Sequence, residues 1–477
     1  MTKFATSLRL SDRLYVCLTV IAVGVFGMTQ PAWTLAQDTD ERPSELGAPH
    51  AAQAEVAPDV ARGASDTMRP NIVVIVSDDQ GFGDIQWNNP EVNTPHLARL
   101  AREGVQFDRF YANPICSVTR AALLTGFATL RTQVNNSSGL DLKYRTLPQE
   151  FQAAGYQTWM CGKWHLGGPE DSQRSGEAYY PQSRGFEHFY GHLHGAIDYD
   201  THHRKDTGEL DWQRNGRPIE EAGFSTDLLA AEAVKLIETR DQDRPFLLYL
   251  AFNAVHGPLS VPPGRDGLSK RDRTQLMQAN IESLDAGVGR VLTCLEQSGL
   301  DQSTLVLFFS DNGGQLSQGA NNGPLRGEKG ETFEGGIRVP AAMRWPGTLE
   351  PGRISEHFLC VTDLLPTLRA AAGIEPREGE LLDGSNQWSA IVSNDVMERP
   401  RFVMGSKDTA TFDPPWKLVL PGRGVEPLLF HIIDDPNETT NLAAEHPELV
   451  EDLVTWTRSI GSPQPRRSTP RDRTRRR

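Results

Sequence analysis

The chain has 477 residues, of which 38% are hydrophobic and 23% are charged, and its formal net charge is −14. This composition is typical of a soluble globular protein with a large core, arranged as one big domain and a smaller companion. The acidic balance argues against general nucleic-acid binding, so an anionic ligand has to be met by locally placed cations.

The N-terminal segment, residues 1–36, has the layout of a secretory signal peptide. Lys3, Arg9 and Arg13 precede the apolar run LYVCLTVIAVGVFGM, and the small residues after it predict cleavage near Ala36. The alternative is a membrane anchor, but the run is shorter than the ~20 residues that a spanning helix needs. We therefore expect export to a periplasm or an extracellular space, without stable membrane insertion.

The rest of the chain divides by composition into four segments. Residues 37–69 hold few large apolar side chains and many Ala, Pro, Asp and Glu, which predicts a disordered spacer. Residues 70–393 have the pattern of a large globular domain, and residues 394–462 that of a small C-terminal subdomain. The arginine-rich segment 463–477 predicts a basic disordered tail.

The large domain alternates compact apolar runs with amphipathic helical patterns. Short buried strands separated by such helices are typical of an α/β fold with a large, mainly parallel sheet flanked by helices. Strands are predicted at 71–76, 156–166, 245–255 and 304–310, and helices at 96–104, 227–240, 281–299 and 361–373.

The C-terminal subdomain has a different texture. Short strand-like pieces with turn residues between them predict a small antiparallel sheet, and a helical pattern follows them. This is the expectation for an α+β subdomain with strands at 401–405, 416–420 and 428–433 and a helix at 446–460.

The cysteines are few and scattered. Cys17 leaves with the signal peptide, and Cys116, Cys161, Cys294 and Cys360 remain. Four scattered cysteines in a chain of this size do not make a disulfide scaffold. If Cys116 is used chemically, the other three can form at most one bridge.

The segment YANPICSVTRAALLTG contains a cysteine at the entrance of a short predicted helix. The pattern predicts a helix over 117–125, with Cys116 just before it and Gly126 as its stop. Positions i and i+4 lie on one side of a helix, so Cys116 and Arg120 are expected to face the same space. Backbone N–H groups point outward at this helix end, which suits an anion.

Polar pairs follow two of the predicted strands. Asp78 and Asp79 follow the first strand, and Asp311 and Asn312 follow the strand at 304–310. Ligands of α/β sheets bind beyond the carboxyl ends of the strands. Paired carboxylates repel unless a cation neutralises them, and hard oxygen ligands favour a divalent metal, calcium rather than magnesium or zinc. The alternative for each pair taken alone is a helix cap or a turn.

Four basic residues complete the set of candidates. Lys163 and His165 in GKWHLGG are two positions apart, so in an extended segment they share a face. A lysine that holds negative oxygens and a histidine that moves protons suit an anionic oxyester. His256 follows the strand at 245–255, and Lys329 lies in a glycine-rich loop that can approach a ligand closely. The alternatives are a surface turn, a structural histidine and a solvated lysine.

With these residues located, the chain resembles the sulfatase family of the alkaline phosphatase superfamily, from Asn71 to about Glu445. Family members carry C-x-P-x-R followed by T-G, and CSVTRAALLTG keeps the cysteine, arginine, threonine and glycine. The motifs SDDQGFGD, GKWHLG, AVHGP, SDNGG and LRGEKGETFEGGIRVPA follow in the family's order, and DDPNETTNLA looks like its C-terminal signature. The resemblance implies an alkaline phosphatase-like fold.

The resemblance also implies a modified nucleophile. A formylglycine-generating or sulfatase-maturing enzyme would oxidise Cys116 to formylglycine, an aldehyde whose hydrate attacks sulfur, and Arg120 would steady the hydrate. The second hydroxyl of the hydrate can then expel sulfate, so two easier steps replace one difficult step. The implied calcium ligands are Asp78, Asp79, Cys116, Asp311 and Asn312.

The remaining roles follow from the same resemblance. Lys163 and Lys329 would grip the sulfate, and His256 would protonate the departing alcohol oxygen. His165 would assist breakdown of the sulfated enzyme.

Two positions depart from the family pattern. Val118 stands where proline is usual, and Phe127 follows Gly126 where a basic residue is common. Because the maturation enzyme reads this segment before folding, Val118 bears on whether Cys116 is converted.

Three functions stay open from the sequence. The first is an exported, calcium-dependent sulfatase that acts on sulfate esters, and the second is an unconverted, non-catalytic protein that binds sulfated glycans. The third is a phosphatase or phosphonate hydrolase of the same superfamily.

Within the sulfatase family, GHLHGAIDYDTHH, NNGPLRGEKGETFEGG and SGLDQSTLVLFFSDNGGQ look most like the arylsulfatase B, or N-acetylgalactosamine 4-sulfatase, type, which favours a sulfated carbohydrate. Five histidines lie in or beside the first of these stretches, and they either line the substrate entrance or belong to a solvated loop: His188, His192, His194, His202 and His203.

Overall fold

The computed structural model describes residues 69–136, 138–168, 173–394, 398–405, 407–422 and 424–461. The predicted signal peptide, the spacer up to residue 68 and the basic tail lie outside the described residues.

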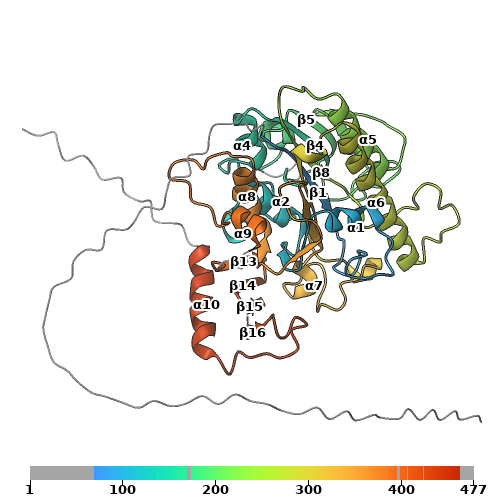
Figure 1. Cartoon of the computed structure of the whole chain (residues 1–477). Coiled ribbons are helices and arrows are strands. Elements are labelled where there is room, and N and C mark those ends of the chain that lie inside the picture. Colours follow the sequence, from blue (N-terminus) through green and yellow to red (C-terminus); the bar gives the residue numbers. More distant parts are fainter. Residues whose placement is uncertain are drawn as a thin grey trace, which may run out of the picture. The chain divides into compact units, whose positions relative to one another are not determined.

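Within the described residues, a ten-stranded sheet lies at the centre of the fold (Figure 1). Strand order across the sheet is β11 (Arg353–Ser355), β2 (Val105–Phe107), β10 (Ala341–Arg344), β9 (Thr304–Ser310), β1 (Asn71–Ser77), β8 (Phe246–Ala251), β4 (Gln157–Lys163), β5 (His188–His192), β6 (Gln213–Arg214) and β7 (Arg217–Pro218). β9, β1, β8, β4 and β5 are parallel, whereas β10 is antiparallel to β9 and β2, and β6 is antiparallel to β5 and β7. The prediction of a large, mixed and mainly parallel sheet is confirmed.

Hydrophobic layers lie on both faces of this sheet. Val73 and Leu248 point into one layer with Val288 of α6, and Val74 points into the other layer with Leu124 of α2. All seven positions of β1 are buried, because helices cover both of its sides. The first layer contains α1 (Pro95–Arg102), α5 (Ser225–Glu238) and α6 (Arg273–Gln297), and the second contains α2 (Cys116–Thr125), α4 (Leu147–Ala153) and α8 (Leu364–Ala371).

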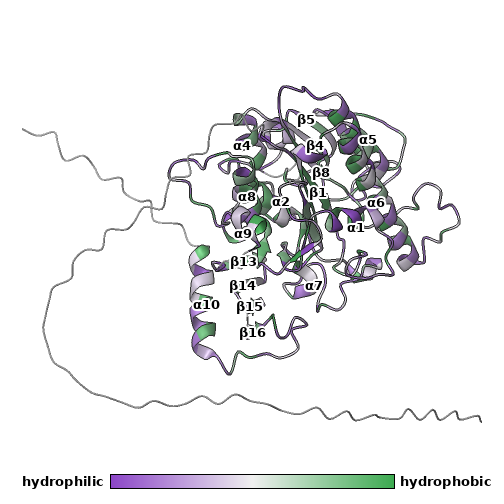
Figure 2. Cartoon of the chain, in the orientation of Figure 1, coloured by the Kyte–Doolittle hydropathy of each residue, from purple (hydrophilic) through white to green (hydrophobic). Residues whose placement is uncertain are grey.

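The helices have the two-sided character that this packing needs. In Figure 2, α5 and α6 carry both hydrophobic and hydrophilic positions. α6 begins eight residues before the predicted start at 281, because the side chain of Asp272 accepts a hydrogen bond from the Gln275 N–H and caps its first turn. The other short helices are α3 (Thr129–Thr132), α7 (Glu334–Ile337), α9 (Trp388–Ser393) and 3-10 turns at Glu177–Tyr179, Pro181–Arg184, Asp301–Ser303, Leu316–Gln318 and Val361–Asp363.

The C-terminal part contains an antiparallel sheet, as expected. Its strands are β13 (Phe402–Gly405), β14 (Thr409–Asp413), β15 (Trp416–Leu420) and β16 (Leu428–His431), in that order, and α10 (Pro447–Ile460) follows them. Leu418, Leu429 and Leu453 join α10 to one face of this sheet. β14 was not predicted as a strand, and the boundary between residues 393 and 394 stays a prediction. A separate two-stranded pair joins β3 (Phe110–Tyr111) to β12 (Leu359–Cys360).

Two further properties bear on function. Among the described helices, none has both the length and the apolar character needed to cross a membrane. The four cysteines of the described chain are buried and unpaired, so Cys161, Cys294 and Cys360 form no bridge with one another.

Candidate active site

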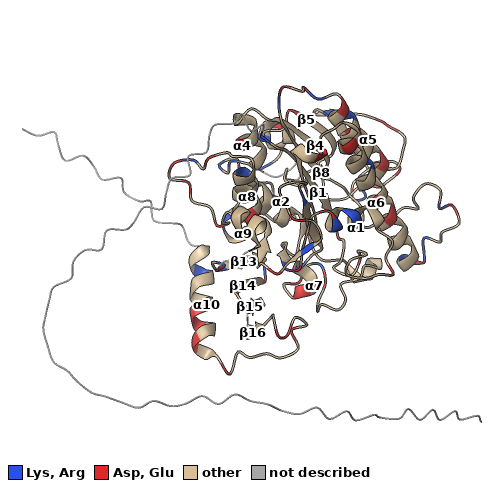
Figure 3. Ribbon diagram, in the orientation of Figure 1, with Lys and Arg blue, Asp and Glu red and all other residues tan. Residues whose placement is uncertain are grey.

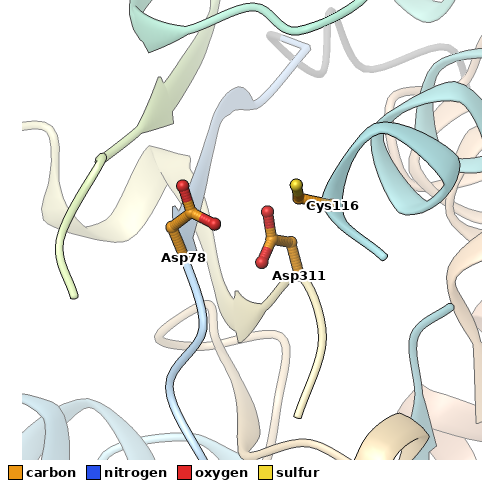
Figure 4. A group of neighbouring side chains, drawn as sticks. All are labelled: Asp78, Cys116 and Asp311. Carbon is orange, nitrogen blue, oxygen red and sulfur yellow. The ribbon is translucent and has the colours of Figure 1, made fainter. Parts of the chain in front are cut away.

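The acidic pairs lie side by side at the carboxyl edge of the sheet. β1 and β9 are hydrogen-bonded neighbours, and their ends are in register at Ser77 and Ser310. Asp78 and Asp311 therefore leave the sheet next to each other, and Figure 4 shows their carboxylates turned toward Cys116. The topology thus brings together three segments that are far apart in the sequence.

Lysines neutralise the two carboxylates that follow β1. Lys163 Nζ lies 2.6 Å from Asp78 Oδ2, and both side chains are fully buried. Lys329 Nζ lies 2.7 Å from Asp79 Oδ2, and His256 Nε2 lies 3.7 Å from the same oxygen. Burial raises the pKa of Asp79, but the nearby His256, Lys329 and Lys163 outweigh it and lower that pKa to about 2. Asp79 is therefore ionised at neutral pH.

The oxygen atoms of this cluster fit a divalent cation. Asp78 Oδ1 and Asn312 Oδ1 are buried, and neither has a hydrogen-bond partner among the described residues. The amide nitrogen of Asn312 donates to Asp79 Oδ1 at 2.8 Å and to the Gly313 carbonyl, which leaves its oxygen available. Ligand atoms of Asp78, Cys116 and Asp311 all lie within 4.8 Å of one another. Such a set of hard oxygen donors suits calcium or magnesium better than zinc.

Cys116 is the first residue of α2, one position inside the predicted entrance. Its Sγ lies 3.3 Å from His165 Nδ1. Burial raises the pKa of the thiol, and the carboxylates of Asp78 and Asp311 add to the effect. An unmodified thiol here stays protonated at neutral pH and is a poor nucleophile. α2 ends at Gly126, which has a φ of 70°, as the sequence predicted.

Arg120 lies one helical turn after Cys116 and is fully buried. Its guanidinium donates to Asp311 Oδ2 from Nε at 3.1 Å and from Nη2 at 2.7 Å, and its Nη1 donates to the Lys163 carbonyl at 2.7 Å. The arginine therefore holds a carboxylate and the end of β4 in place. It reaches the same centre as Cys116, as the helical spacing predicted.

The extended pattern in GKWHLGG does not continue as far as expected. β4 ends at Lys163, and His165 has a φ of 55°, in the left-handed region. The shared-face argument for Lys163 and His165 was therefore wrong, although both side chains reach the site. The imidazole packs so closely against Gly195 that a Cβ there would lie 2.8 Å from His165 Nε2.

A cavity of about 470 Å³ opens above this cluster. Its lining includes four of the predicted residues, namely Cys116, His165, His256 and Lys329. Burial lowers the pKa of His165 well below its usual value and that of His256 to about 4, so both imidazoles are neutral at pH 7. An anion bound beside them would favour their protonated forms.

Part of the cavity wall was not predicted. His194 was named as a possible lining residue of the entrance, but seven others were not: Asn136, Gly167, Gly195, Ala196, Arg204, Lys205 and Asp206. His194 is fixed from both sides, by Asp211 Oδ2 at 2.9 Å from its Nδ1 and by Arg204 at 3.2 Å from its Nε2.

Only one of the five histidines in this stretch lines the cavity. His194 does so, whereas His202 is buried and stacks on Trp212 with ring centroids 4.4 Å apart. His188 pairs with Glu232, His192 is buried, and His203 is exposed. The stretch is therefore neither a histidine-lined entrance nor a solvated loop.

Comparison with known proteins now decides the family. The family model described as Sulfatase matches residues 70–374. The chain belongs to the sulfatase family. Mouse N-acetylgalactosamine-6-sulfatase is 34% identical over 364 residues, which cover 70% of this chain and 68% of the relative. Human arylsulfatase A is 35% identical over 356 residues, which cover 68% of each protein.

Other relatives differ in how much of their length is matched. Mouse arylsulfatase J is 33% identical over 346 residues, or 69% of this chain, and the match spans 57% of that relative. The crystal structure of Ps i-CgsB in complex with k-i-k-neocarrahexaose has a TM-score of 0.74 at 30% identity and covers 83% of this chain and 93% of its own. These likenesses confirm the alkaline phosphatase-like sulfatase fold. The closer resemblance to the arylsulfatase B type stays a prediction.

The fold alone is shared more widely. The phosphonate monoester hydrolase of Agrobacterium radiobacter has a TM-score of 0.62 at 20% identity, covering 82% of this chain and 95% of its own. A likeness at this level concerns the architecture only.

Proposed function

We propose that this chain is an exported, calcium-dependent sulfatase that hydrolyses sulfate esters of carbohydrates, with formylglycine made from Cys116 as its nucleophile. The observation that carries the proposal is the position of Cys116. It lies at the start of α2, between a cluster of buried carboxylates and a cavity lined by Lys329, His165 and His256. A sulfate ester needs a nucleophile on one side and cations around its oxygens, and this arrangement offers both.

Formylglycine would supply a hydrated aldehyde as the attacking group. The fit of residue 116 to that role rests on its surroundings, since a buried thiol with a raised pKa has little reactivity of its own. His165 Nδ1, 3.3 Å from Sγ, is placed to exchange a proton with residue 116. A maturation enzyme would have to act before folding, because Cys116 is only 2% exposed.

The cations divide into two groups by position. Lys329 lines the cavity and is placed to bind sulfate oxygens, together with His256. Lys163 and Arg120 are fully buried against Asp78 and Asp311, so they act on the substrate through the site's charge and geometry. His256 would give a proton to the departing alcohol oxygen once the anionic substrate raises its pKa.

Asp78, Asp79, Asp311 and Asn312 would hold calcium, with residue 116 as a further ligand. Calcium would neutralise negative charge next to the nucleophile. The buried oxygens of Asp78 and Asn312 that lack hydrogen-bond partners support this assignment. Calcium is preferred because its larger, more flexible coordination shell tolerates carboxylates and an amide in irregular geometry.

A sulfated glycan is the proposed substrate class. The name of the relative N-acetylgalactosamine-6-sulfatase and the neocarrahexaose in the Ps i-CgsB complex support it, because both name a sugar. Export is proposed from residues 1–36, whose pattern predicts a signal peptide.

Hydrolysis of 4-nitrophenyl sulfate and 4-nitrophenyl phosphate by the full chain, expressed with a maturation enzyme, tests the proposal. We expect sulfate release to be preferred and to be lost in Cys116→Ala. A preference for phosphate would assign the site to a phosphatase or phosphonate hydrolase. Glycan binding without any hydrolysis, with Cys116 unmodified, would assign it to a binding protein.

A further inference from the structure

A second cavity adjoins the active-site cavity. It measures about 340 Å³, and its lining includes Gly257, the residue after His256. Lys205 lines both cavities, so the two meet at this side chain. The rest of the second cavity is lined by Pro258, Leu259, Lys270, Arg273, Leu276 and Gln318.

The walls of the second cavity are cationic. Its lining contains Lys205, Lys270 and Arg273 but no carboxylate among the described residues. Figure 3 shows both basic and acidic positions in the loop that leads into α6, and the acidic ones are not among the residues that line the cavity. In the active-site cavity the one acidic lining residue, Asp206, is ion-paired with Arg204. In a chain of net charge −14, a cavity lined by three basic side chains and no acidic one requires an explanation.

The two lysines keep their charge available. Lys205 and Lys270 are exposed, and neither forms a hydrogen bond or an ion pair within the part of the chain that the structure describes. Asp198 lies close enough for Lys270 to contribute to lowering its pKa, but that carboxylate already accepts hydrogen bonds from the N–H groups of Asp200 and Thr201. Arg273 differs from the lysines, because it donates to the Ser317 carbonyl.

The lining of the second cavity also has an apolar component. Pro258, Leu259 and Leu276 lie among the lining residues with the three cations. Sugar rings present C–H faces, and sulfate or carboxylate groups project from their rims. A cavity lined by both apolar and cationic side chains matches both parts of an anionic sugar.

We propose that the second cavity binds a neighbouring sulfated or carboxylated sugar of the same glycan chain whose sulfate ester occupies the active-site cavity. The inference rests on the proposed function and extends it. It makes the substrate an oligomeric or polymeric anionic glycan rather than an isolated sulfated sugar. Lys205 lies at the junction of the two sites, and Lys270 contacts only the sugar in the second cavity.

Lys270→Glu in the full-length protein tests this assignment, with Lys235→Glu as the matched control. Lys235 is an exposed lysine of α5. The carbonyl of its neighbour Val234 accepts a 3.8 Å hydrogen bond from Cys294 Sγ, near the end of α6, whereas Arg273 of the second cavity lies at the start of that helix. The probes are hexasaccharides and disaccharides of chondroitin 6-sulfate and of ι-carrageenan, and calorimetry gives the dissociation constants.

We expect Lys270→Glu to weaken hexasaccharide binding about fivefold at low salt and to leave disaccharide binding within about twofold. Lys235→Glu should change neither. An equal loss in both variants, unchanged hexasaccharide binding in Lys270→Glu, or no binding of either hexasaccharide by the unmutated chain would overturn the proposal. Hydrolysis of 4-nitrophenyl sulfate reports separately on the proposed function, since that ester does not extend into the second cavity.

Discussion

Arg120 places two hydrogen bonds on one oxygen of Asp311. Nε and Nη2 both donate to Oδ2, at 3.1 and 2.7 Å, while Oδ1 accepts the backbone N–H of Asp79 at 3.3 Å. This fixes the plane of a carboxylate that lies next to Cys116. The arginine of the C-x-x-x-R pattern thus directly supports the carboxylate cluster that we propose as the metal site.

Removing this guanidinium leaves a buried carboxylate without its partner. We expect Arg120→Ala to lower the free energy of unfolding by about 3–5 kcal/mol and Arg120→Lys to restore only part of it, because lysine lacks the fork of donors. Urea unfolding gives the values. Arg290→Ala, which breaks an exposed pair with Asp227, should cost no more than about 1 kcal/mol. Equal effects at the two arginines would contradict the buried-pair argument.

Calcium should stabilise the folded chain. Ligand binding to the folded state adds about 2.7 kcal/mol when free calcium is about 100 times its Kd. We expect the Tm to rise with calcium, to rise less with magnesium, and to fall when a chelator is added. Asn312→Ala removes one oxygen of the cluster and should reduce the calcium-dependent rise. A Tm independent of calcium would exclude a calcium site at Asp78 and Asp311.

The position of His165 depends on the absence of a side chain at residue 195. In Gly195→Ala the new methyl group would lie 2.8 Å from His165 Nε2, so the imidazole has to move. Displacement of a catalytic group by about 1 Å can cost about 100-fold in rate, so we expect kcat to fall by at least tenfold with little change in Tm. Gly267→Ala, where a Cβ meets open space, is the control. Full activity in Gly195→Ala would show that His165 does not need this position.

A buried lysine joins the C-terminal sheet to α7, which follows the loop that carries Lys329. Lys417 Nζ lies 2.8 Å from both Glu334 Oε1 and Glu438 Oε1, and all three side chains are fully buried. Lys417→Met leaves two carboxylates without a cation, so we expect a loss of about 3–5 kcal/mol in the free energy of unfolding. Lys407→Met, an exposed change in the same subdomain, should have little effect.

The Lys417→Met variant should also depend on pH. Burial raises the pKa of Glu438, and repulsion by Glu334 adds to it, while Lys417 opposes both. Without the lysine, the folded state binds a proton at Glu438 more tightly than the unfolded chain does. The free energy of unfolding therefore falls as the pH rises from the pKa of Glu438 in the unfolded chain to its higher pKa in the folded state. The variant should thus lose more stability at about pH 8 than at about pH 5 in urea unfolding. An equal loss at both values would contradict this coupling.

The sequence predicted the residues of the site better than their contacts. Asp78 and Asp311 could be found because each follows a long apolar run, and parallel strands bring their carboxyl ends together. The partners of these carboxylates could not be found in this way. Arg120 and Asp311 are 191 residues apart and Lys163 and Asp78 are 85 apart, and no local pattern links such positions.

The cavity wall was harder to predict for a different reason. The stretch around His194 has no helical or strand periodicity, and its shape depends on single contacts such as the hydrogen bond between His194 and Asp211 and the stacking of His202 on Trp212. β14, with the sequence TATFD, also gave little signal, because Phe412 is its only large apolar residue, whereas the equally short β15 is the apolar run WKLVL.

Mass spectrometry of the peptide that contains Cys116, from protein purified from its native host, tests the central claim most directly. Val118 replaces the proline usual in this motif, so conversion is the step that the sequence leaves open. We predict formylglycine at position 116, with sulfate release in proportion to the converted fraction. Unmodified cysteine in all of the protein would contradict the account.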